Sequence, residues 1–145
     1  MQRVFSGVCE AALALPPAAL GAQASANLAN AVPRLGALAG PRSVQAQLLT
    51  HLASATLASP HGQLLPRHAA QLLNALSRHR AASSSSSDDS DDSGRVVVPR
   101  GLGAHLAAAL RGAGPQGASA QDLGLISHSP TLNFAIYIFL VCTYS

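Results

Sequence analysis

The chain has no tryptophan and no lysine, and aromatic residues make up only 3% of its 145 residues. Other strand-forming residues are also few, which disfavours a protein built on a β-sheet. The two cysteines, Cys9 and Cys142, lie near opposite ends of the chain. Two cysteines so placed make neither a disulfide framework nor a CxxC motif, and they indicate free thiols in a reducing compartment.

Acidic residues are scarce too, and four of the six lie in one run between Asp88 and Asp92. The rest of the chain carries nine arginines against only Glu10 and Asp122, a net charge of +7. Arginine binds phosphate with two parallel hydrogen bonds and stacks on bases, so this balance favours an anionic partner. The alternative is that the arginines are ordinary solvated side chains.

Alanine and leucine are abundant, with 29 and 22 copies. Both lose little side-chain entropy in a helix, so they predict an all-α protein with a thin core. Helix-like segments alternate with Pro/Gly breaks, and Ser43 stands where an N-cap is expected. The expected helices cover residues 3–15, 23–35, 43–58, 66–79 and 102–110. Short loops between them favour stacked α-hairpins, an α-α hairpin solenoid of about three helix pairs.

The chain divides into four parts by composition. Residues 1–80 carry two helical hairpins, and residues 101–126 begin a third that is incomplete. Between them, residues 81–100 form an acidic Ser/Asp insert and linker that we expect to be disordered, because it has almost nothing to bury. Ser85 and Ser86 each have an aspartate three positions on, which makes them phosphorylation candidates.

The final part, residues 127–145, is an atypical hydrophobic tail that holds most of the aromatic residues. Its unbroken apolar run, Phe134 to Cys142, is too short to span a bilayer, so membrane insertion is not expected. A buried strand or helix is one interpretation of it. The interpretation we prefer is that the tail is foreign to the domain, for example from intron read-through. The N-terminus fits a secretory signal poorly and an organelle transit peptide in part.

No catalytic or metal-binding pattern stands out. The six histidines are scattered, none pairs with another at i, i+4, and none lies near a cysteine in the sequence. The segment "RVVVPRGLGAHLA" superficially resembles a dinucleotide loop, but Pro99 follows its short apolar run and Leu106 occupies the third glycine position. We therefore expect no enzyme activity, no cofactor, no metal and no small-molecule substrate.

One helix-like segment occurs in two similar copies, 44 positions apart, as "ANLANAVPRLG" (26–36) and "AQLLNALSRHR" (70–80). Apolar residues such as Leu28 and Leu72 match between the copies and predict one buried side. The other side repeats two amides and an arginine, namely Asn27, Asn30 and Arg34 in the first copy and Gln71, Asn74 and Arg78 in the second. A period of 44 residues lies in the range typical of helical solenoids.

These segments resemble the second helix of the octotricopeptide repeat. They are also similar to the leucine-rich helical region of FAST-kinase-domain and RAP-domain proteins, whose pattern is roughly A-N-L-L-W-A-L-A-R-L-G. This sequence departs from that pattern at Asn30 and Asn74, where the family usually has tryptophan, and at Pro33, where it usually has alanine. The resemblance covers residues 3–126 apart from the insert.

The resemblance implies an α-solenoid that binds single-stranded RNA in a mitochondrion or chloroplast and assists RNA processing, stability or translation. Amides can hydrogen-bond base edges and arginines can hold phosphates. The candidate base-contacting residues are Asn27, Asn30, Gln71 and Asn74, and the candidate phosphate-contacting residues are Arg34, Arg78, Arg80 and Arg111. Two alternatives stay open: a protein–protein interaction scaffold, and a truncated, non-functional fragment of a larger repeat protein.

Overall fold

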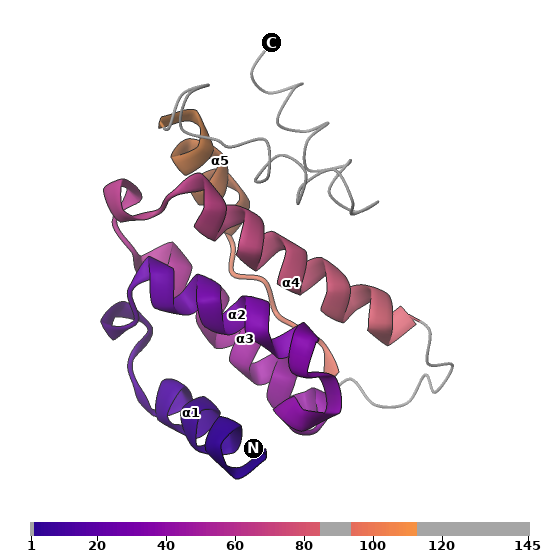
Figure 1. Ribbon diagram of the computed structural model, residues 1–145. Helices are drawn as coiled ribbons and strands as arrows, with labels where there is room; N and C mark the ends of the chain where they lie inside the picture. The colour runs from indigo at the N-terminus through magenta and orange to yellow at the C-terminus, as the bar shows by residue number, and fades with distance from the viewer. Residues whose placement is uncertain (1, 85–93, 113–145) are drawn as a thin grey trace.

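The computed structural model describes residues 2–84 and 94–112, and these residues are entirely helical or coil (Figure 1). This part of the chain contains five α-helices, and three short 3-10 turns join the first four of them. In chain order the elements are α1 (Gln2–Ala14), η1 (Pro17–Ala19), α2 (Ala22–Leu35), η2 (Gly36–Ala39), α3 (Arg42–Ala58), η3 (His61–Gln63), α4 (Pro66–Ser84) and α5 (Leu102–Gly112). The all-α expectation is confirmed for this part of the chain.

The expected Ser43 cap is wrong. Helix α3 starts one residue earlier, at Arg42, with Pro41 as its N-cap residue and no side-chain capping bond. The proline ring holds the backbone of Pro41 at φ −57°, which leads directly into the helix. Ser43 therefore lies inside the first turn.

Helix α4 is longer than expected, because it continues through the first residues of the predicted insert to Ser84. Ala81 and Ala82 favour helix, and the Arg42 guanidinium donates a hydrogen bond of 2.6 Å to the carbonyl of Ala82. The insert therefore starts later than residue 81. The phosphorylation candidates Ser85 and Ser86, the second half of the third hairpin and the tail lie outside the described residues.

The turn between α2 and α3 depends on two glycines and one glutamine. Gly36 and Gly40 have φ of 51° and 94°, which side-chain-bearing residues rarely adopt. The Gln45 side-chain amide donates to both of their carbonyls, at 3.1 Å and 2.8 Å. The buried glutamine thus satisfies two backbone acceptors and sets the angle between α2 and α3.

Helix α3 lies at the centre of the molecule and contacts each of the other four α-helices. Its Leu48, Leu49 and Leu52 are fully buried. Helices α2 and α4 lie side by side and run in the same direction, so the two copies of the repeated segment are neighbours in space (Figure 1). Ala29 of α2 and Leu72 of α4 are both fully buried in the same core.

Helix α5 closes the far side of the core, against α3 and α4. It buries Leu102 and Leu106, and the segment before it is tied down by a 3.0 Å hydrogen bond from the Val97 amide to the Thr50 hydroxyl. The ring of His105 stacks on His61, with ring centres 4.1 Å apart. No helix within the described residues has the length and apolarity needed to cross a membrane.

Candidate nucleic-acid interface

The repeated polar residues lie on the sides of α2 and α4 opposite the residues that these helices bury. Asn27, Arg34 and Arg78 are exposed, and Asn30 and Asn74 are half-buried. We call these five residues the outer face. Because α2 and α4 are parallel neighbours, an amide and then an arginine follow each other in the same order along both helices.

Gln71 differs from its partner in the first copy. Asn27 is exposed, whereas Gln71 is half-buried and its side-chain oxygen Oε1 is buried without a hydrogen-bond partner. An unpaired buried carbonyl carries a desolvation cost. Gln71 therefore lies at the border of the outer face rather than on it.

Arg80 and Arg111 are exposed but do not belong to the outer face. Two residues of helix place Arg80 about 160° around α4 from Arg78. Arg111 lies in the last turn of α5, which packs on α3 and α4 rather than beside α2. The structure thus brings together five of the eight candidate residues and leaves these two apart, with Gln71 between.

The described part of the chain is strongly cationic. All nine arginines fall within residues 2–84 and 94–112, and Glu10 is the one carboxylate side chain there. That carboxylate lies on α1, where it accepts a 3.1 Å hydrogen bond from the Ser6 hydroxyl. Arg34, Arg67 and Arg78 consequently have no acidic side chain among the described residues to neutralise them.

An open hollow with both polar and apolar lining lies where α2 and α4 begin. It has a volume of about 350 Å³, and its most polar lining groups are Gln23, Gln63, Arg67 and His68. Ala22 and Leu65 add apolar groups to the wall, and Gly21 and Gly62 complete it without side chains. We call this cavity the N-terminal hollow. The first amides of a helix have no partner within it, and Gly21 offers α2 no side-chain cap, so backbone donors add to this end of the molecule.

His68 holds the Arg67 side chain beside the hollow. Its ring Nε2 lies 3.4 Å from the Arg67 Nε, and its Nδ1 lies 3.3 Å from the Leu65 amide. A neutral imidazole has a single acceptor nitrogen, so one of these contacts at a time is a hydrogen bond. Burial lowers the pKa of His68, and the charge of Arg67 lowers it further. A hydrogen bond to the Gln63 backbone acts in the opposite direction, but the net effect is a lowered pKa. The neutral ring leaves the guanidinium charge uncompensated.

Sequence reasoning missed this hollow, although the repeat register contains a signal for it. Gln23 and Arg67 are 44 positions apart, the same offset as the rest of the repeat, and both are second residues of their helices. Extending the aligned segments by one turn toward the N-terminus would have found them.

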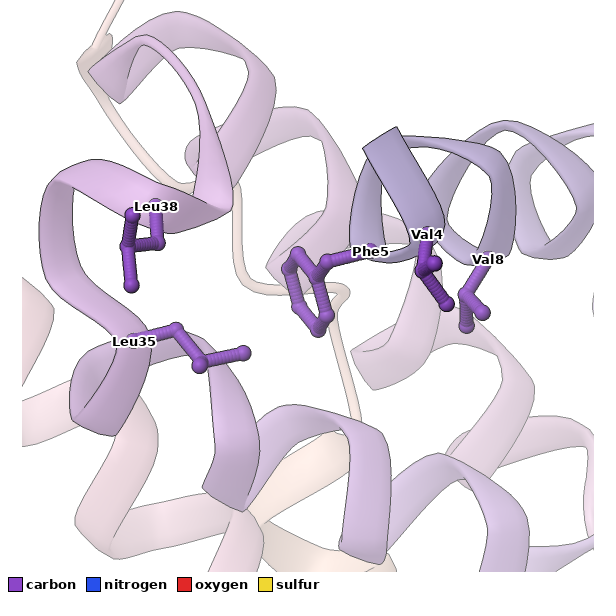
Figure 2. A pocket seen from close by; sticks show the side chains of 5 residues that line it. All are labelled: Val4, Phe5, Val8, Leu35 and Leu38. Atoms are coloured by element: carbon purple, nitrogen blue, oxygen red, sulfur yellow. The ribbon is translucent and has the colours of Figure 1, made fainter. Parts of the chain in front are cut away.

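A second hollow has the opposite chemistry. A groove of about 180 Å³ lies between α1 and the α2–η2 corner, lined by Val4, Phe5, Val8, Leu35 and Leu38. Figure 2 shows the Phe5 ring turned toward Leu35 and Leu38 across the groove. We call it the apolar groove. It has no polar side chain to orient a ligand, so it offers only hydrophobic contact.

Among the residues that the structure describes, the remaining reactive side chains do not form a site. Cys9 is buried, and burial together with the neighbouring Glu10 charge raises the pKa of its thiol, which keeps it protonated and unreactive. Burial lowers the pKa of His105 and of His79 as well. Within the described ranges, no three metal-ligating side chains come together.

Comparison with protein-family models, with curated proteins and with solved structures found no match.

Proposed function

We propose that this protein is a non-catalytic helical-repeat protein that binds single-stranded RNA on the outer face of α2 and α4. One observation carries the proposal: the two copies of the amide–arginine pattern lie on parallel neighbouring helices, with Arg34 and Arg78 both exposed. Side chains that recur at equal spacing along a surface suit a polymer with a regular backbone.

The helix arrangement supports a solenoid interpretation. Helix α3 contacts α1 and α5, and α2 contacts α4, so helices that alternate in the chain touch one another, although α2 also packs on α3. Stacked α-hairpins produce this alternation, with one helix of each pair in each layer. In this proposal α2 and α4 are the equivalent second helices of successive hairpins, and their layer is the one that meets RNA.

The electrostatics of the described residues support an anionic ligand. Nine arginines against Glu10 attract a polyanion, and arginine is suited to the planar, two-point recognition of phosphate. The amides of Asn27, Asn30 and Asn74 can both donate and accept, which base edges require. The proposal also includes a location in a mitochondrion or chloroplast, as the resemblance implies. Imaging of a tagged full chain tests this location.

The test is binding of the full chain to a pool of single-stranded RNAs, measured by fluorescence anisotropy at two salt concentrations. We expect binding that weakens as salt rises. The Arg34→Ala/Arg78→Ala variant should bind RNA about tenfold more weakly, because each substitution removes one contact to a phosphate. The matched control is Arg95→Ala/Arg100→Ala, which removes the same charge from two exposed arginines on the segment before α5. Circular dichroism confirms that both variants fold.

Two results would overturn the proposal. One is a folded protein that does not bind RNA. The other is equal weakening by the two double variants, which would assign the binding to net charge rather than to the outer face.

A protein–protein scaffold is the second candidate, favoured by the apolar groove beside α1. Val4 is 72% exposed and Leu38 is 48% exposed, although both are apolar. Surfaces of this kind mark contact sites for other proteins. Protein binding that ignores salt and depends on the groove rather than on Arg34 and Arg78 would favour this candidate.

A further inference from the structure

We propose that the N-terminal hollow is a phosphate-binding site, and that it holds one phosphate of the RNA strand that the outer face binds. The proposal deepens the proposed function and rests on it for the identity of the strand. The hollow has room for a phosphate, with a volume of about 350 Å³. Its one charged group, the Arg67 guanidinium, carries the charge that a phosphate requires.

The Arg67 charge has no acidic partner among the described residues. Its neighbour is the ring of His68, which is 4% exposed and whose pKa burial lowers. When its Nε2 is the acceptor, the buried neutral ring orients the exposed Arg67 guanidinium without neutralising it. An uncompensated cation at the wall of a hollow favours an anionic occupant.

Apart from the apolar side chain of Leu65, the other lining groups are donors or are small. Gln23 and Gln63 carry side-chain amides that can donate to phosphate oxygens. Gly21 and Gly62 leave the entrance open, and a Cβ added at either would meet no atom within 4 Å. The free backbone amides of the first turn of α2 also lie at the start of that helix, and they add to the positive potential at the hollow.

The hollow is continuous with the outer face. Gln23 lies one helical turn before Asn27, and Arg67 lies two turns before Asn74 on the same side of α4. A strand that follows the outer face toward the start of both helices therefore reaches the hollow. This continuity points to an RNA phosphate as the occupant rather than to a separate small molecule.

The experiment uses inorganic phosphate and the ¹⁵N-labelled full chain, titrated at constant ionic strength with chloride as the reference anion. We expect saturable shifts in the amide resonances of Ala22, Gln23 and Arg67. The Arg67→Gln variant should bind phosphate about tenfold more weakly. The matched control, Arg100→Gln, removes an exposed arginine elsewhere and should leave the affinity unchanged.

A second pair of variants tests the hollow without touching Arg67. Gly21→Asp and Gly21→Asn both place a capping side chain at the start of α2, but only the aspartate adds a negative charge. We expect Gly21→Asp to abolish the phosphate shifts and Gly21→Asn to reduce them less. Equal loss in both variants would overturn the electrostatic argument.

Binding of RNA separates this proposal from the one on which it rests. If phosphate binds and Arg67→Gln weakens it, but RNA does not bind, then the hollow is a phosphate site and the proposed function fails. If RNA binds through Arg34 and Arg78 but phosphate causes no shifts in the hollow, the present inference is wrong and the proposed function remains. Unchanged RNA affinity in Arg67→Gln would overturn the placement of the strand.

Discussion

Helices α2 and α4 carry the same outer pattern on different inner sides. The α2 helix packs inward with small residues, among them Ser25, Ala26 and Ala29. The α4 helix buries a large side chain, Leu72, and also a histidine at each end of its packed side, His68 and His79. Both helices nevertheless present an amide and an arginine outward at matching positions.

The comparison shows that the buried sides of α2 and α4 differ while their outer sides carry the same pattern. An inner side must fit its neighbours, and α2 meets α3 and α4 at close range, which small residues permit. An outer side has no neighbour to fit, so a repeated pattern there is not imposed by packing. That freedom is the reason the outer face, rather than the core, is the part of the repeat to which we assign a function.

The largest expected effect comes from matched leucines in the two copies. Leu72 is fully buried and Leu28 is half-buried at the equivalent position. We expect Leu72→Ala to lower the free energy of unfolding by about 3 kcal/mol, because it removes buried surface and leaves a cavity. Leu28→Ala should cost roughly 1 kcal/mol, because its side chain is already partly in water. Chemical denaturation followed by circular dichroism measures both, and equal losses would contradict the difference in packing.

A smaller effect is a loss of stability at acidic pH that depends on α4. Burial lowers the pKa of His68 and of His79, with help from the charges of Arg67 and Arg42 respectively. Helix α2 contains no histidine. The unfolded chain binds these protons more readily than the folded chain, so stability rises with pH and is complete above the ordinary histidine pKa of about 6.5.

We therefore expect the melting temperature to fall by roughly 5 °C between pH 7.5 and pH 5. Scanning calorimetry across this range measures it. The double variant His68→Gln/His79→Gln should have a shallower dependence, and the part that remains belongs to His105, whose pKa burial also lowers. A wild-type melting temperature that does not change over this range would refute the assignment.

The smallest expected effect concerns the amides that start the pattern. Gln71 has a buried side-chain oxygen without a partner, whereas Asn27 at the equivalent position is exposed. Gln71→Leu should raise the free energy of unfolding by up to about 1 kcal/mol, because it removes an unsatisfied polar group. Asn27→Leu should leave it within about 0.5 kcal/mol of wild type. Thermal melts of both variants provide the comparison, and a destabilised Gln71→Leu would mean that the amide makes an important contact.

Much of the local structure follows from residue type. Alanine and leucine runs, interrupted by proline and glycine, place five helices close to their observed positions. The errors lie at the ends, where Ser43 is not a cap and α4 runs on to Ser84. Both depend on neighbours, because Pro41 sets the start of α3 and the long-range bond from Arg42 to Ala82 supports the last turns of α4.

Part of the candidate site, too, could be assigned from the sequence, and part of it could not. Asn27, Arg34 and Arg78 could be assigned to one side of their helices from spacing alone, because a helix repeats every 3.6 residues. Spacing alone also separates Arg80 from Arg78. It could not move Gln71 to the border of the outer face, because that outcome depends on which side of α4 is covered. Nor could it assemble the hollow from Gln23, Gln63 and Arg67, which three separate segments contribute.

The sequence by itself determined the helical class, the scarcity of acids and the two copies of one polar pattern, because these depend on residue type and on distances of a few positions. The tertiary structure decided that the copies lie parallel and adjacent, that His68 is buried beside Arg67, and that an apolar groove stays open beside α1. Those features depend on contacts between segments tens of residues apart. They come from how all the helices fill one shared core together, which a local pattern cannot encode.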